Sequence, residues 1–168
     1  MAERWGSLSP LRVDLDEVAA AMDHLDRSET DHFLDLDTGE VITLSVPLLE
    51  AVRRGLNLEE TDLPEWVLDD EPLARAAIGD PHGKRFARIP EGTWIDMDEM
   101  RVRFVRAIKS EGVLQKFAEA ATLHDGGARF YELLKTYPEL STAWYRFEAR
   151  QKQTWARQWL ERIGVEAV

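Results

Sequence analysis

The sequence has no cysteine among its 168 residues. This absence excludes disulfide bonds, thiolate metal ligands and cysteine nucleophiles at once. A chain of this length buries about 70% of its unfolded surface on folding, so its core needs no covalent or metal crosslink. The lack of cysteine also fits a reducing compartment, and the sequence therefore favours a cytoplasmic location.

Long apolar runs are absent as well. The longest near the N-terminus is residues 18–22, whereas a helix that spans a bilayer needs about 20 apolar residues. Residues 1–13 also lack the apolar stretch of about 7–15 residues that a secretory signal requires. We therefore expect a soluble, non-secreted protein that has no membrane partner.

Recognisable catalytic motifs are missing too. The sequence contains no nucleophile elbow, no Walker loop and no dinucleotide-binding fingerprint. The run Asp35–Glu40 resembles the start of a calcium loop, but its twelfth position, Val46, is not the glutamate that such a loop requires. The sequence therefore predicts no catalytic residue and favours a non-enzymatic protein over an enzyme of an unrecognised type.

The histidines form no motif that is typical of a metal site. His24, His32, His82 and His124 include no His-x-x-x-His pair, which is the spacing that places two zinc ligands on one helix face. His24 and His32 could meet at the junction between the first helix and the first strand. A solvated acidic edge is the favoured interpretation of this junction, and the sequence predicts neither a metal ion nor another cofactor.

The two parts of the chain carry opposite net charge. Residues 1–100 hold 9 Lys and Arg against 24 Asp and Glu, a net charge of −15. Residues 101–168 hold 12 against 8, a net charge of +4, so the whole chain is acidic at −11. Such asymmetry indicates either a charged partner surface or attraction between the two parts, within the fold or across a dimer.

The N-terminal part predicts helices around a small antiparallel sheet. Asp14 is placed to cap a first helix. Residues 32–46 predict a hairpin in which Gly39 supplies the positive φ that a short loop requires. Pro47 suits the first turn of the next helix, and residues 84–89 alternate as a third strand does.

Residues 56–83 form an acidic segment that we interpret as variable. Seven Asp and Glu residues fall between positions 59 and 71, around Trp66. A short helix is expected over residues 71–78, and the glycine- and proline-containing stretch 79–83 is expected to be a loop. The segment as a whole matches no motif.

The C-terminal part predicts a helical bundle. In its last helix a mostly apolar set of residues recurs at three- to four-residue spacing, which indicates one packed face. These residues are Leu140, Trp144, Phe147, Gln151, Trp155 and Trp159. Arg146, Arg150 and Arg157 fall nearly opposite at about 100° per residue. We interpret the tryptophans as core rather than as a stacking platform for bases, and the arginines as a face for phosphates or an acidic protein surface.

A second candidate binding site lies at the turn before residue 128. Gly126 and Gly127 open a helix, and free N–H groups at a helix N-terminus attract anions. Arg129 could add a bidentate contact to the same anion. The alternative interpretation is that the two glycines only make a tight turn between helices.

Parts of the chain resemble the bacterial family named Uncharacterised Protein Family 0158. The run Phe33–Val41 is similar to the hairpin of that family. The C-terminal signature of the family resembles Arg129-Phe130, Tyr137-Pro138-Glu139-Leu140, Trp144-Tyr145-Arg146-Phe147, Trp159-Leu160-Glu161 and Gly164-Val165-Glu166. The resemblance covers about residues 30–46 and 89–166, and at Asp125–Phe130 the chain lacks one arginine and one aromatic residue of the family pattern. It supports the fold outline and implies no established reaction, cofactor or substrate.

Together these patterns predict an α+β protein with a small antiparallel sheet of about three strands, N-terminal helices and a C-terminal helical bundle. An acidic part at residues 1–90 and a helical part at residues 91–168 are expected to form one compact domain. The leading hypothesis for the function is a non-enzymatic interaction or regulatory protein that binds a protein partner or itself through charged surfaces. The alternatives are a nucleic-acid-associated protein that uses the basic helix face and an enzyme.

Overall fold

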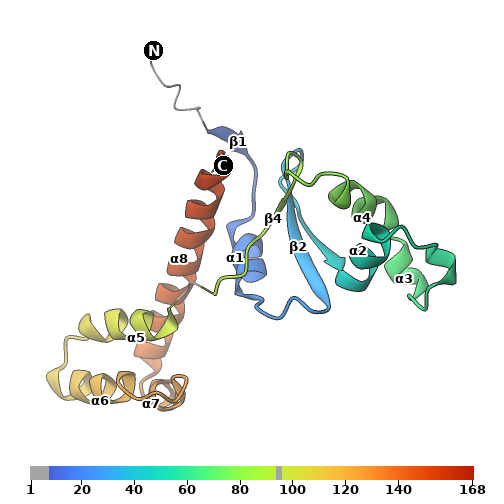
Figure 1. Cartoon of the computed structure of the whole chain (residues 1–168). Helices are drawn as coiled ribbons and strands as arrows, with labels where there is room; N and C mark the ends of the chain where they lie inside the picture. The colour runs from blue at the N-terminus through green and yellow to red at the C-terminus, as the bar shows by residue number, and fades with distance from the viewer. Residues whose placement is uncertain (1–7, 94–95) are drawn as a thin grey trace. The chain divides into compact units, whose positions relative to one another are not determined.

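The computed structural model describes residues 8–93 and 96–168 (Figure 1). The chain divides into two compact units. Unit 1 is made of the chain up to Gly92 together with Trp155–Val168, and unit 2 is made of Thr93–Thr154. Helix α8 (Pro138–Arg162) contributes its first part to unit 2 and its last part to unit 1. The single compact domain expected from the sequence stays a prediction.

Unit 1 is built on a three-stranded antiparallel sheet with the strand order β3-β2-β4. Strand β2 (Thr30–Asp35) pairs with β3 (Val41–Ser45) across the hairpin and with β4 (Phe86–Arg88) on its other side. The α+β class and the small antiparallel sheet predicted from the sequence are therefore confirmed.

Helix α2 (Val46–Arg53) begins one residue earlier than the sequence indicated. The Ser45 hydroxyl accepts the N–H of Leu48 at 3.3 Å and so caps the helix. Val46, which the alternating pattern placed at the end of the hairpin, therefore belongs to the helix. The hairpin itself is confirmed from Thr30 to Ser45.

The two faces of the sheet pack against different helices, because side chains alternate along each strand. On one face Phe86 joins α2 and α4 (Glu71–Ile78) in one apolar core. On the other face Leu34 joins α1 (Leu15–Asp23) and the last turns of α8, where Trp159 lies, in a second core. The sheet thus lies between two helical layers within unit 1.

The hairpin turn depends on Gly39, as predicted. Its φ is +81°, and a Cβ atom at this position would lie 2.0 Å from the Arg12 carbonyl oxygen. We expect Gly39→Ala to lower the free energy of unfolding by about 2–4 kcal/mol, because a left-handed alanine and a steric clash with backbone both cost energy. Urea unfolding followed by circular dichroism measures this change.

Gly55→Ala is the matched control for this prediction. Gly55 also has a positive φ, at +66°, but a Cβ atom placed there would meet no atom of the described residues within 4 Å. The control should therefore lose only the backbone contribution, about 1–2 kcal/mol. If Gly39→Ala and Gly55→Ala lost the same free energy of unfolding, the close approach of the Arg12 carbonyl to the turn would be contradicted.

A two-stranded parallel sheet was not predicted. Strand β1 (Ser9–Leu11) pairs with β5 (Val165–Ala167), with Pro10 opposite Glu166. Each strand has only three residues, so neither shows the alternation over 4–8 residues that identifies a strand in a sequence. The pair joins the beginning and the end of the chain within unit 1.

Unit 2 is a set of helices around an aromatic core. Helices α5 (Met97–Arg106), α6 (Glu111–Ala121) and α7 (Ala128–Thr136) pack with the first part of α8, which confirms the predicted C-terminal helical bundle. Trp144 is fully buried, and its ring meets that of Phe130 edge to face with 4.9 Å between centroids. The interpretation of Trp144 as a core residue is therefore confirmed.

Candidate functional site

Three of the predicted binding residues are exposed on α8. Arg146 and Arg150 belong to unit 2 and Arg157 to unit 1. Across residues 8–93 and 96–168, no carboxylate lies within ion-pairing distance of any of the three. Tyr145, next to Arg146, is 58% exposed. The part of α8 in unit 2 therefore presents two cations and an aromatic ring to solvent.

The glycine turn before α7 is filled by a carboxylate of the chain itself. Gly126 and Gly127 have φ values of +68° and +85°. Asp125 accepts the N–H groups of Arg129 and Gly127, each at 3.0 Å, and these bonds hold the pKa of the Asp125 carboxyl below its ordinary value. The start of α7 thus already has an anionic acceptor. Binding of an external anion at this turn stays a prediction.

Arg129 does not lie alone at this turn. Its exposed guanidinium pairs with Glu132 at 3.1 Å. Arg101 of α5, which the sequence gave no reason to select, is only 5% exposed and pairs with Asp98. A Cβ atom on Gly127 would lie 2.8 Å from the Arg101 Nη1. The second glycine therefore makes room for a buried cation, which is a structural role that the sequence could not reveal.

The acidic segment is folded onto unit 1 by its apolar residues. Its elements are η1 (Leu58–Glu60) and α3 (Glu65–Leu68), followed by α4, which confirms the helix expected at residues 71–78. Leu58 and Val67 are buried in the core beside α2. The segment is thus held in place while its carboxylates face solvent.

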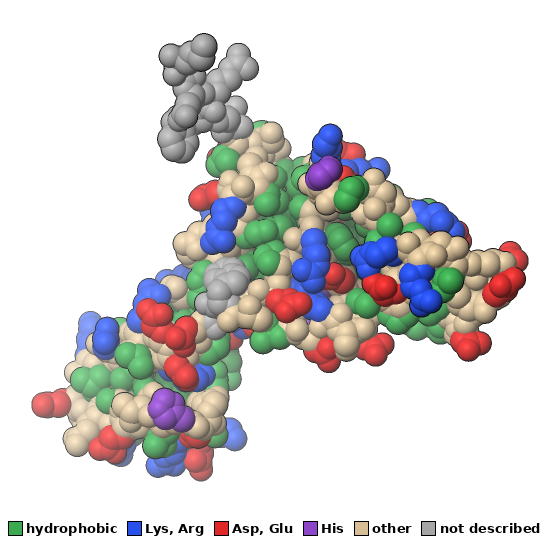
Figure 2. Space-filling model, in the orientation of Figure 1, with side chains coloured by type: hydrophobic (Ala, Val, Ile, Leu, Met, Phe, Trp, Pro, Cys, Tyr) green, Lys and Arg blue, Asp and Glu red, His purple; other side chains and the backbone are tan. Residues whose placement is uncertain are grey.

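Trp66 is the exception among the apolar side chains of α3. It is 73% exposed, although the next residue, Val67, is buried. No Lys or Arg lies between residues 55 and 74, whereas seven carboxylates fall between 59 and 71. Figure 2 shows acidic side chains gathered over the end of unit 1 where α3 lies. A large exposed ring within a field of negative charge is therefore the most unusual surface feature of unit 1.

The junction between α1 and β2 does bring His24 and His32 together. The His24 Nδ1 lies 2.9 Å from the His32 Nε2, and the His32 Nδ1 lies 2.9 Å from the Thr43 hydroxyl. Burial, together with the nearby Arg27 charge, lowers the pKa of the His32 imidazole. A neutral His32 ring satisfies both of its contacts, because one ring nitrogen donates and the other accepts.

Asp31 lies beside this junction and accepts hydrogen bonds from two arginines. Its carboxylate lies 2.7 Å from Arg27 and 2.7 Å from Arg88. Burial acts to raise the pKa of the Asp31 carboxyl, but bonds from Arg88, the His32 N–H and Arg27 outweigh burial, so the pKa is lowered. Asp31 therefore favours folding in its charged form.

We expect Asp31→Asn to lower the free energy of unfolding at pH 7 by about 1.5–3 kcal/mol, the range for hydrogen bonds to charged groups. Because the pKa is lower in the folded chain, this contribution is complete above the ordinary aspartate value of about 3.9. It is lost as the pH falls below that value. Urea unfolding of both proteins between pH 7 and pH 2 measures it. A difference that stays constant to pH 2 would contradict the charged pairing.

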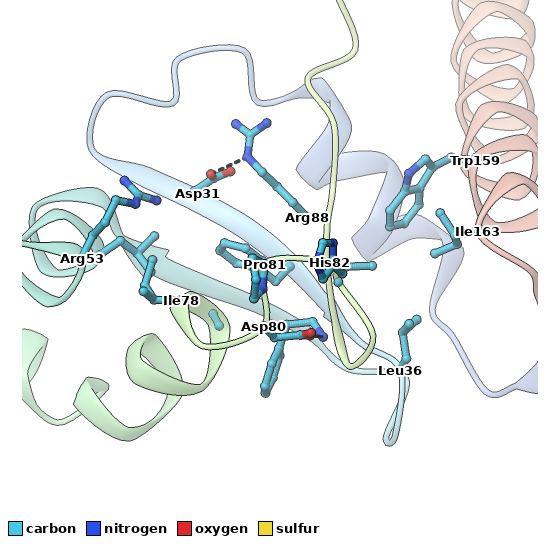
Figure 3. A pocket seen from close by; sticks show the side chains of 16 residues that line it. Asp31, Leu36, Arg53, Ile78, Asp80, Pro81, His82, Arg88, Trp159 and Ile163 are labelled. Carbon is cyan, nitrogen blue, oxygen red and sulfur yellow. Dashed lines mark hydrogen bonds and ion pairs between the residues drawn. The ribbon is translucent and has the colours of Figure 1, made fainter.

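A pocket in unit 1 was not predicted at all. It has a volume of about 760 Å³ and lies beside β4, with Arg53 and Ile78 on one side and Trp159 and Ile163 on the other (Figure 3). Its lining comes from segments that are distant in the sequence, so no local pattern could have indicated it. Among residues 8–93 and 96–168, no group of three or more His, Asp or Glu side chains is arranged to hold a metal ion.

Comparisons with known proteins point to one family. A family model described as "Uncharacterised protein family (UPF0158)" matches residues 68–168. A UPF0158 protein of Pseudomonas aeruginosa is 28% identical over 160 residues, which cover 95% of this chain and 88% of that protein. No solved structure matches the chain significantly. No helix in the described part of the chain is long and apolar enough to cross a membrane.

Proposed function

The chain belongs to the Uncharacterised protein family UPF0158, and because that name carries no activity we propose a function from the surfaces of the molecule. It is a non-enzymatic interaction protein that binds a partner protein through charged surfaces. The principal surface is the acidic surface, defined as the carboxylates of residues 59–71 with Trp66 among them. The observation that supports this proposal most strongly is the 73% exposure of Trp66.

The exposure of Trp66 is unfavourable for an isolated chain. A large aromatic side chain contributes most to stability when it is buried, and its neighbour Val67 shows that the core of unit 1 is within reach of α3. At protein interfaces, however, tryptophan is among the residues that contribute most of the binding energy. Trp66 is therefore better explained as an anchor for a partner than as part of the fold.

The charge around Trp66 specifies the chemistry of the partner. Carboxylates in this number attract a segment that carries Lys or Arg, and complementary charge speeds association. A guanidinium or ammonium group can also lie over the face of the indole ring, which adds a cation–π contact. We therefore expect a basic segment of another protein, and binding that weakens as the salt concentration rises.

Affinity capture with the tagged full chain tests the proposal, using a lysate of its source organism treated with nuclease. We expect a protein that is retained by the wild type and lost with Trp66→Ser, because truncation of an interface anchor costs about 2 kcal/mol or more. Leu123→Ser is the matched control, since Leu123 is 49% exposed but lies in unit 2. Equal retention by Trp66→Ser and the wild type would reject the acidic surface as the binding site.

A second candidate function is supported by the basic face of α8 in unit 2, defined as Arg146 and Arg150. These exposed side chains without carboxylate partners in the described chain are suited to phosphates, and exposed Tyr145 is suited to stacking on a base. This alternative is a nucleic-acid-associated protein. It predicts that nuclease releases the captured material and that Arg146→Glu with Arg150→Glu abolishes capture. Capture that survives both changes would exclude it.

A further inference from the structure

Strand β4 is an edge of the sheet, and its main chain is only half paired. The Ile89 N–H donates to the His32 carbonyl at 2.9 Å, which shows that Ile89 faces β2. In an antiparallel pair the residues that bond to the neighbouring strand alternate with residues that point away from it. The N–H and C=O groups of Arg88 therefore point away from β2, toward the side where the sheet has no further strand.

The main-chain groups of β4 that point away from β2 differ in whether they have a hydrogen-bond partner. Asp80 accepts the outward N–H of Phe86 at 2.8 Å and so closes the beginning of this edge. For Arg88, neither main-chain group has a hydrogen-bond partner on that side among residues 8–93 and 96–168. An open edge of this kind is a template for pairing with another extended chain.

The pocket of about 760 Å³ lies along this same edge. The residues that line it come from both helical layers and from the loop of residues 80–83 before β4. Figure 3 shows Pro81 and His82 near the centre of this hollow and Arg88 above them, with Ile78 and Arg53 toward α4 and α2 and with Trp159 and Ile163 on α8. The hollow therefore has two walls, and the unpaired main chain lies between them.

We propose that this hollow binds an extended segment of another protein, which adds a strand to the sheet at Arg88. The main-chain groups of Arg88 would supply hydrogen bonds to the segment, and the two walls would receive its side chains alternately. The site uses neither the acidic surface nor the arginines of the basic face. The inference therefore stands or falls separately from the proposed function.

The walls specify which side chains the segment carries. Side chains on one face of the added strand would meet Trp159 and Ile163, so they are apolar. Side chains on the other face would meet Ile78 together with the half-exposed side chains of Arg53 and Arg88, which pair with Glu50 and Asp31, so they are polar. The segment is therefore expected to alternate apolar and polar residues.

A second copy of this chain fits the hollow poorly. Two β4 edges related by a twofold axis at Arg88 would place one Arg88 directly opposite the other, and like charges in such a pair are destabilising. A segment that places no arginine opposite Arg88 avoids this repulsion.

Selection from a random octapeptide library on the full chain tests the proposal. We expect enriched peptides that alternate apolar and polar residues. One enriched peptide is then made in two forms, N-methylated at its odd or at its even positions. Only one edge of an added strand bonds to β4, so one form should lose about tenfold or more in affinity while the other keeps it. The Arg88 amide should also exchange its hydrogen more slowly when the peptide is bound.

Ile163→Glu should abolish binding of the selected peptide, because it places a charge in the apolar wall. Leu25→Glu is the control, since Leu25 is 53% exposed in unit 1 and does not line the pocket. Trp66→Ser should leave peptide binding unchanged. The proposal is overturned if no peptide is enriched, if both N-methylated forms bind equally, or if Ile163→Glu binds as the wild type does while its circular dichroism is unchanged.

Discussion

Arg27→Met is expected to lower the free energy of unfolding by about 3–5 kcal/mol, the range for removing one partner of a buried ion pair. The Arg27 side chain is 5% exposed and pairs with Asp31 at 2.7 Å. It also donates to the carbonyl oxygens of His24 and Ala21 at 2.7 Å each and of Ile89 at 3.0 Å. Its loss would leave these carbonyls without their donor and would leave the partly buried Asp31 carboxylate with one arginine instead of two.

The comparison that isolates this effect is Arg53→Met. Arg53 also forms an ion pair, with Glu50, but both side chains are more than half exposed. Exposed pairs contribute about 0–1 kcal/mol, so this control should stay close to the wild type. Urea unfolding at pH 7 measures both variants. A loss below about 1 kcal/mol for Arg27→Met would show that the arginine does not join α1 to the sheet as described.

Trp144→Ala is the second change with a large expected effect. Trp144 is fully buried, and its ring lies 4.9 Å from that of Phe130 and 5.3 Å from that of Phe104 between centroids. Truncation of a buried tryptophan removes its packing and leaves a cavity, at a cost of about 3–5 kcal/mol. The measurement is again the free energy of unfolding in urea. Any binding test on this variant must be preceded by this measurement, because an unfolded fraction would mimic lost function.

Two further variants make this prediction specific. Tyr145→Ala changes the adjacent residue, which is 58% exposed, and should alter stability by no more than about 0.5 kcal/mol. Trp144→Phe should lose less than Trp144→Ala, because it keeps an aromatic ring and removes an indole N–H. That N–H is buried and has no hydrogen-bond partner in the described chain. Equal losses for Trp144→Ala and Tyr145→Ala would refute the aromatic core of unit 2.

Local patterns account for most of what the sequence predicted correctly. The positive φ of Gly39, the cap at Asp14 and the buried face of α8 at Trp144 each depend on residues close in the chain. The boundary error at Val46 has a local cause as well, because the Ser45 cap competes with continuation of the strand. Periodicity alone cannot decide whether Val46 continues the strand or begins the helix.

Features that depend on distant residues could not be predicted. Strands β1 and β5 pair across almost the whole length of the chain. Arg27 lies in an acidic stretch that is typical of a solvated loop, yet carbonyl groups from two distant segments, at His24 and Ile89, accept its hydrogen bonds. The space beside Gly127 is occupied by Arg101, which comes from α5. The pocket beside β4 likewise exists only after the sheet and its two helical layers have assembled.

The negative charge of the acidic surface was visible in the sequence, but the exposure of Trp66 was not. An aromatic residue between Pro64 and Val67 is equally compatible with a buried position. Only the packed position of Val67 shows that α3 turns one side to the core and Trp66 to solvent. This orientation is what distinguishes a binding surface from a merely solvated acidic segment.

Photocrosslinking from position 66 in living cells of the source organism tests whether the acidic surface binds a partner. Benzoylphenylalanine replaces Trp66 in one variant and Leu123, which is also exposed, in the control. The account predicts that light produces a discrete adduct with a basic protein from position 66 and none from position 123. No adduct from position 66, or the same adducts from both positions, would contradict a partner-binding role for the acidic surface.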